Sequence, residues 1–131
     1  MIVVDASVLA NVVGDDGADG DRARAALRGE QLSVPDLVDV EVVSVLRRRW
    51  LAKTMTARRF AAAVDDLGAV PADRYPVLPF MPRAYELRAN LSAYDATYVA
   101  LAEQLGCALL TADRRLASAH GPRCAITVIS T

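Results

Sequence analysis

Histidine, cysteine and lysine are scarce in this sequence, and their scarcity excludes several kinds of site. The only histidine, His120, lies in a polar "AHGP" turn, so a histidine general base is not expected. Zinc prefers histidine and cysteine, and Cys107 and Cys124 lack the spacing of metal ligands, so we expect two ordinary structural thiols. A phosphoryl-transfer receiver or phosphatase needs a helper lysine beside its aspartate, and Lys53 is the only lysine.

Long apolar runs are also absent. No apolar stretch approaches the roughly 20 residues that span a bilayer, and the N-terminus has no basic region and carries Asp5 inside its first apolar run. Hydrophobic residues make up 53% of the chain and charged residues 24%, spread evenly along it. We therefore expect one globular domain over residues 1–131, in a cytoplasmic protein without membrane contact.

Positive charge is not in excess, but the basic residues are unevenly placed. The net charge is -1, and arginine supplies 14 of the 15 basic residues. Six basic residues fall within positions 47–59. Solvated helix faces and a phosphate-binding rim both explain such a cluster, and the sequence leaves both interpretations open.

Strand-like and helix-like segments alternate along the chain. Short apolar runs predict strands, and the prolines of the run at 74–82 restrict it to a short edge strand and a turn. Strands are expected within 1–4, 31–35, 74–82, 107–111 and 125–130. Helices are expected after residue 5 and within 22–29, 36–52, 56–68, 83–91, 92–105 and 114–119, with a glycine-rich loop at 14–21. This alternation predicts an α/β fold, a three-layer α/β/α sandwich with a mainly parallel central sheet.

Two aspartates lie where predicted strands end. Asp5 ends the first apolar run, and Asp113 follows the run at 107–111. In α/β sheets, ligands bind at the carboxyl ends of the strands. Aspartate is also a common helix-capping residue after a strand, so each position alone is compatible with either role.

Two further acids lie early on helices, on faces expected to pack against the sheet. Glu41 falls between Leu37 and Val45 on a helical wheel, although a thin polar stripe continues from it. Asp95 begins the apolar face of the helix at 92–105, and Ser92 three residues earlier gives the pattern of a capping box. Alone, each of these acids also has a structural explanation.

Together the four acids predict a metal site. Four carboxylates about 5 Å apart would repel each other by roughly 3 kcal/mol per pair at an effective dielectric near 20, and a divalent cation compensates for this repulsion. Oxygen ligands suit Mg²⁺ or Mn²⁺, and such a site activates a water for attack on a phosphodiester. Ser7 and Thr111 stand two residues from Asp5 and Asp113, where each hydroxyl would hold a water or cap a helix.

Four motifs resemble those of PIN-domain ribonucleases, in the order "VVDASVLANV", "PDLVDVEV", "YDATYVALAE" and "LLTADRRL". Within that family, the chain is similar in size and motif order to the VapC toxins of bacterial type II toxin-antitoxin pairs. The resemblance covers essentially the whole chain. It implies a Mg²⁺- or Mn²⁺-dependent endoribonuclease, a homodimer and a cognate antitoxin. By position, the acidic cluster of the family matches Asp5, Glu41, Asp95 and Asp113, and the hydroxyls beside it match Ser7 and Thr111.

The chain departs from some of these proteins after the last acid. Where they carry a further acid, this sequence has arginines, so we expect one cation site and a second completed only by substrate phosphate. The candidates for RNA contacts are Arg47, Arg48, Arg114 and Arg115. The alternative is a non-catalytic PIN-like module that binds RNA or protein, and the presence of all four acids counts against it.

Overall fold

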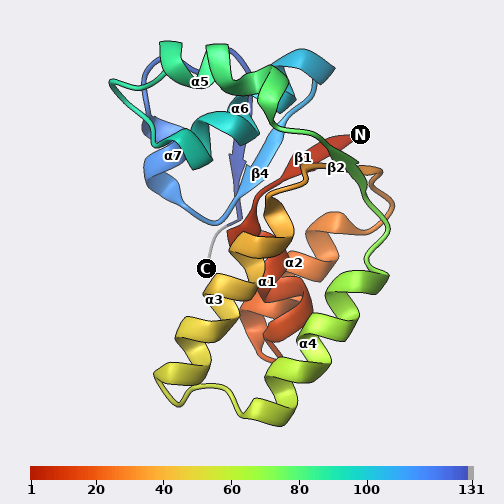
Figure 1. Ribbon diagram of the computed structural model, residues 1–131. Coiled ribbons are helices and arrows are strands. Elements are labelled where there is room, and N and C mark those ends of the chain that lie inside the picture. Colours follow the sequence, from red (N-terminus) through yellow and green to blue (C-terminus); the bar gives the residue numbers. More distant parts are fainter. Residues whose placement is uncertain (130–131) are drawn as a thin grey trace.

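Five parallel strands form the centre of the computed structural model, which describes residues 1–129 (Figure 1). Their order is β3-β2-β1-β4-β5, and every neighbouring pair is parallel. The strands are β1 (Ile2–Val4), β2 (Leu32–Pro35), β3 (Asp73–Tyr75), β4 (Leu109–Thr111) and β5 (Ile126–Val128). The predicted edge strand is β3, which begins one residue before the expected range 74–82 and ends directly before the first proline of that range.

Seven helices flank this sheet, which confirms the predicted α/β class. They are α1 (Ala6–Gly14), α2 (Ala18–Leu27), α3 (Val38–Leu51), α4 (Ala57–Ala69), α5 (Met81–Glu86), α6 (Ala93–Leu105) and α7 (Arg114–Ser118), with a 3₁₀ turn, η1 (Leu78–Phe80). Figure 1 shows α1 to α4 in the lower part of the view and α5 to α7 in the upper part. Among the described residues, no helix has the length and hydrophobicity needed to cross a membrane.

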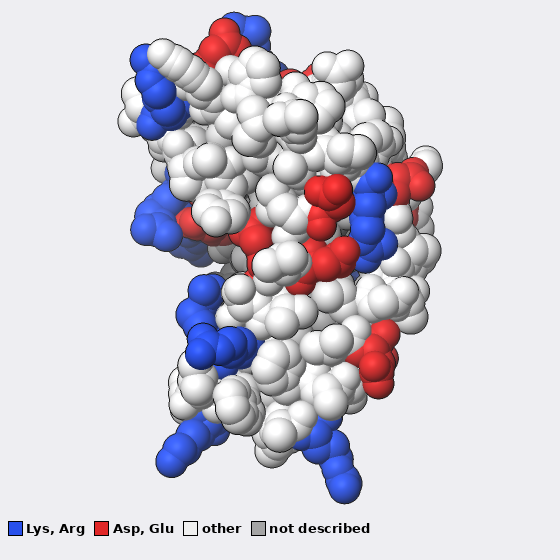
Figure 2. Space-filling view, in the orientation of Figure 1, with Lys and Arg blue, Asp and Glu red and all other residues white. Residues whose placement is uncertain are grey.

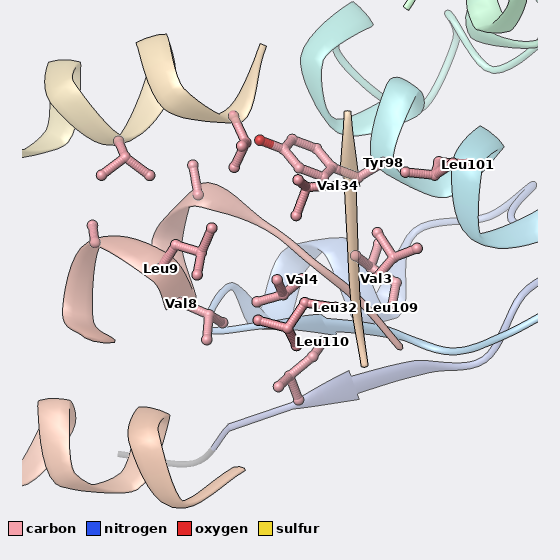
Figure 3. Packing of buried hydrophobic residues seen from close by; sticks show 14 of the residues in the cluster. Val3, Val4, Val8, Leu9, Leu32, Val34, Tyr98, Leu101, Leu109 and Leu110 are labelled. Atoms are coloured by element: carbon pink, nitrogen blue, oxygen red, sulfur yellow. The ribbon is translucent and has the colours of Figure 1, made fainter. Parts of the chain in front are cut away.

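The three central strands, β2, β1 and β4, are buried on both faces, as expected when helices cover both sides of a parallel sheet. Val3, Val4, Val34 and Leu109 are fully buried. Helix α6 packs on β1, β2 and β4, and Figure 3 shows the Tyr98 ring of α6 among the core residues, with its hydroxyl directed towards α3. This packing fixes the start of α6 relative to the carboxyl ends of β1 and β4.

Helix caps place three polar side chains where helices begin. Asp5 caps α1 by accepting from the Val8 N–H at 3.3 Å, and Asp113 caps α7 by accepting from the Arg115 N–H at 2.9 Å. Ser92 caps α6 at 3.1 Å from the N–H three residues later. The capping role that the sequence left open for both aspartates is therefore present, and it orients both carboxylates at the carboxyl edge of the sheet.

Three element boundaries differ from those expected from sequence. Helix α2 begins inside the expected loop at 14–21, because the Asp15 carboxylate accepts from two backbone N–H groups and stabilises the first turn. Helix α5 spans Met81–Glu86 and not 83–91: it begins earlier than expected, since Pro82 is favourable in a first turn, and it ends five residues earlier. The last strand spans Ile126–Val128, and residue 130 of the expected strand lies outside the described residues.

Gly20 is required where α2 passes the preceding turn. A Cβ at this position would lie 1.8 Å from the Asp15 carbonyl oxygen, whereas a Cβ at Gly68 in α4 would meet no atom within 4 Å. We expect Gly20→Ala to lower the free energy of unfolding by about 1–3 kcal/mol. The matched Gly68→Ala should raise it by up to about 1 kcal/mol, because alanine is the better helix former. Denaturant unfolding of both variants checks this pair, and equal effects would contradict it.

Candidate active site

Asp5 is a buried acid at the end of β1, with 6% of its surface exposed. Its Oδ1 accepts from the Ser7 hydroxyl at 2.6 Å, in addition to the α1 cap, and its Oδ2 accepts from the Thr111 hydroxyl at 2.5 Å. Within residues 1–129, Asp5 forms no ion pair. The carboxylate is thus held firmly while its charge stays uncompensated.

The hydroxyl groups of Ser7 and Thr111 hold this carboxylate, and each of them both donates and accepts a hydrogen bond. Each donates its proton to Asp5 and accepts a backbone N–H near the end of β4: Ala112 N–H to Ser7 Oγ at 3.1 Å, and Asp113 N–H to Thr111 Oγ1 at 3.0 Å. Neither hydroxyl caps a helix. The two side chains join the start of α1 to the end of β4, so Asp5 and Asp113 are positioned by one hydrogen-bond network.

Glu41 lies in the first turn of α3 and is held from α6. The Tyr98 hydroxyl donates to Glu41 Oε1 at 2.7 Å, and the Tyr98 side chain is almost entirely buried. Figure 3 shows this hydroxyl at the end of the ring that is directed towards α3. From sequence alone, Tyr98 is one of the residues on the apolar face of the helix at 92–105 and is not a candidate for the site. Its position three residues after Asp95, on the same helix face, is the signal that identifies it.

Asp95 lies among the other three acids. Its charge acts on both Asp5 and Glu41, and the charge of Asp113 acts on Asp95 in turn. Asp95 and Asp113 line the same hollow, next to Ser92 and Arg115. Since the Ser92 hydroxyl caps α6 through the backbone of residue 95, the Asp95 carboxylate is not required for that cap.

Burial and mutual repulsion make three of these acids harder to ionise. Burial is the main cause that raises the pKa of Asp5, of Glu41 and of Asp95 above its usual value. Hydrogen bonds from neighbouring hydroxyls oppose this effect, and the adjacent carboxylates reinforce it. In their ionised form at neutral pH, these acids lower the free energy of unfolding when no cation is bound. Perturbed pKa values of this kind cluster at functional sites.

The four acids do not form a ready-made cage for a cation. Within residues 1–129, no three Asp, Glu, His or Cys side chains are arranged to hold a metal ion by themselves. Three of the carboxylates already have side-chain partners: Asp5 has two hydroxyls, Glu41 has Tyr98 and Asp113 has Arg115. The donor set still fits Mg²⁺ or Mn²⁺, because such ions prefer oxygen ligands, keep several waters and need only one or two carboxylates.

The candidate arginines divide between the two ends of the site. Arg115 pairs with Asp113 at 3.4 Å, and Arg114 is exposed beside it on α7. Arg48 lines a hollow with Glu41, while Arg47 is exposed on α3. Figure 2 shows acidic side chains at the indentation on the left of the molecule, with basic side chains above and below it.

Part of the basic cluster at 47–59 serves the fold instead. Arg49 donates to Asn11 Oδ1 at 2.6 Å, and Arg59 donates to the Val13 carbonyl at 2.8 Å and pairs with Asp16 at 3.0 Å. These bonds join α3 and α4 to α1 and to the turn after it. The phosphate-rim interpretation is therefore restricted to the remaining basic residues.

Comparison with known proteins identifies the family. The PIN domain family matches residues 2–121, a range that contains all four acids. Ribonuclease VapC9 of Mycobacterium tuberculosis is 46% identical over 129 residues, which cover 98% of each chain. The chain belongs to the VapC ribonucleases of the PIN-domain family.

Two solved structures share this fold. The crystal structure of VapC20 from M. tuberculosis, described as a sarcin-ricin loop cleaving toxin, aligns with a TM-score of 0.66 and 20% identity over 83% of this VapC chain and 87% of the other. A toxin-antitoxin complex from Klebsiella pneumoniae aligns with a TM-score of 0.67 and 16% identity over 99% and 98% of the two chains.

The repulsion between Asp95 and the neighbouring carboxylates can be tested by measuring protein stability in the absence of metal. In EDTA at neutral pH, Asp95→Asn should leave the melting temperature unchanged or raise it, because the substitution removes a half-buried charge beside other carboxylates. The exposed Asp65 in α4 gives the matched control, and Asp65→Asn should have little effect.

The rise in melting temperature expected for Asp95→Asn should become smaller as the pH falls. Since the folded-state pKa of Asp95 is raised, its ionisation costs stability above that pKa, and the cost disappears as pH falls to the usual value of 3.8 and below. Differential scanning fluorimetry across this range should show the two melting curves converging at low pH. An Asp95→Asn protein less stable than wild type at neutral pH would contradict the repulsion.

Proposed function

We propose that this VapC protein is a Mg²⁺- or Mn²⁺-dependent endoribonuclease whose cation binds among Asp5, Glu41, Asp95 and Asp113. The observation that carries the proposal is the buried, uncompensated charge of Asp5, surrounded by further half-buried acids. A protein that retained these acids for structure alone would be expected to neutralise them with arginine or lysine. The non-catalytic binding module, which is the alternative, gives no reason for leaving Asp5, Glu41 and Asp95 without an ion pair from the described residues.

The residues of the site have separate tasks in this mechanism. When bound, the cation would lower the pKa of the attacking water and stabilise the charge on the phosphodiester. Ser7 and Thr111 donate to Asp5 and so favour its ionised, ligating form. Tyr98 fixes one oxygen of Glu41 and leaves the other without a hydrogen bond from the described residues. Arg115 is placed to bind a phosphate oxygen once Asp113 turns to the cation.

Metal dependence is tested by stability and cleavage together. A cation that binds only the folded site stabilises by about 1.4 kcal/mol at ten times its dissociation constant, so Mn²⁺ and Mg²⁺ should raise the melting temperature of the wild type. Asp5→Asn should lose this shift and RNA cleavage, while Asp65→Asn keeps both. Zinc should substitute poorly. Cleavage that persists fully in EDTA would rule out the metal mechanism.

We further propose a homodimer and a protein antitoxin as partners, in line with the toxin-antitoxin complex among the structural neighbours. An apolar hollow of about 450 Å³ lies on α3 and α4, lined by Trp50, Phe60 and Val64 among others. Trp50 is 43% exposed, and its ring centroid lies 6.5 Å from that of Phe60. An amphipathic antitoxin segment would fill this hollow and extend a basic residue to the acids.

Expression in a bacterial host tests the toxin role and the hollow together. Wild type should arrest growth, co-expression of the antitoxin from the neighbouring gene should restore it, and Asp5→Asn should be harmless. Trp50→Ala should weaken the complex by about tenfold or more, as expected for a buried aromatic anchor, and should leave RNA cleavage intact. Harmless wild type, together with an Asp5→Asn protein that behaves like wild type in every RNA assay, would favour the binding-module alternative.

A further inference from the structure

The hollow that Glu41 shares with Arg48 lies between α3 and α6. It has a volume of about 330 Å³ and is lined by Val40, Glu41, Ser44, Val45, Arg48 and Tyr94. Tyr94, the residue before Asp95 on α6, is 61% exposed, and Val40 on α3 is 70% exposed. Two large apolar side chains are thus left in solvent at the edge of an acidic site. Neither contributes to the core.

Polar groups of the same hollow follow one stripe of α3. Glu41, Ser44 and Arg48 are spaced three and four residues apart, so they lie on one helix face. Arg48 forms no ion pair within the described part of the chain and keeps its guanidinium free. The hollow therefore offers an aromatic ring and a free cation next to a proposed metal-site acid.

We propose that this hollow binds one unpaired nucleobase of the RNA substrate, which stacks on Tyr94 while Arg48 contacts a neighbouring phosphate. The proposal rests on the proposed ribonuclease function and adds a requirement to it: the nucleotide beside the cleaved bond must be single-stranded. Proteins that read RNA loops stack splayed bases on exposed aromatic rings and bind the backbone with basic side chains. A base held in a duplex has no free face for Tyr94.

RNA binding by variants of Tyr94 tests the subsite. The RNA probes are short single-stranded oligomers of A, of U and of C, and the duplex formed by the A and U oligomers. The measured quantity is the enzyme concentration at which single-turnover cleavage in Mn²⁺ is half-saturated. Loss of one stacked base corresponds to roughly 5- to 150-fold weaker binding, so Tyr94→Ala should raise the half-saturating concentration by that factor. Tyr94→Trp should restore it, and the duplex should bind poorly to every variant.

Tyr85 provides the matched control on another face. It is 54% exposed on α5, with the Arg88 guanidinium 4.0 Å from its ring centre, and it lines none of the hollows at the acids. Tyr85→Ala should leave RNA binding unchanged. The Mn²⁺-induced melting shift and the sedimentation coefficient should be the same in wild type, Tyr94→Ala and Tyr94→Trp.

Three results would overturn the subsite. The first is wild-type binding by Tyr94→Ala while Asp5→Asn loses cleavage, which leaves the ribonuclease proposal standing. The second is a changed oligomeric state in Tyr94→Ala, which assigns the exposed Tyr94 and Val40 to contact with a second copy of the chain. The third is a wild type that neither binds nor cuts any of the RNAs or a structured RNA, which removes the proposed function and the subsite together.

Discussion

The buried carboxylate of Asp5 is the constraint on which the rest of the site depends. It ends β1, caps α1 and receives the hydroxyls of Ser7 and Thr111, so a single side chain joins two strands and a helix at the carboxyl edge of the sheet. Hydrogen bonds satisfy its oxygens but do not cancel its charge. Asp95 and Glu41 are brought up to this charge by α6 and α3. The fold therefore creates a local excess of negative charge that the folded protein tolerates at a cost.

The fold could be predicted from the sequence because its strands and helices differ in sequence pattern. β2 and β4 are short apolar runs buried along their length, and α6 combines a Ser92 cap with a left-handed Gly106 at its end. The boundary of α2 could not be predicted, since it depends on the Asp15 carboxylate accepting from two backbone N–H groups. Polar composition in a short segment does not separate a loop from a capped helix start.

The sequence supplies a set of candidate site residues but not their geometry. Strand ends and helix faces are sequence properties, so Asp5, Glu41, Asp95 and Asp113 were found as candidates. The hydrogen bond from Tyr98 to Glu41 spans 57 positions and requires the packed orientation of α6 against α3. Likewise, nothing in the spacing of the arginines separates Arg49 and Arg59, which hold α1, from Arg48, which lines the hollow beside Glu41. Such distinctions depend on tertiary contacts between distant segments.

The central claim is that a divalent cation, and not an arginine or a proton, balances the charge around Asp5. Anomalous diffraction from crystals soaked in Mn²⁺ locates the ion directly. The account predicts one strong peak within coordination distance, about 2.0–2.2 Å, of an oxygen of Asp5 or Asp95, with Arg115 displaced from Asp113 and waters completing the shell. A protein that cleaves RNA in Mn²⁺ but shows no peak among these four acids in saturated crystals would contradict it.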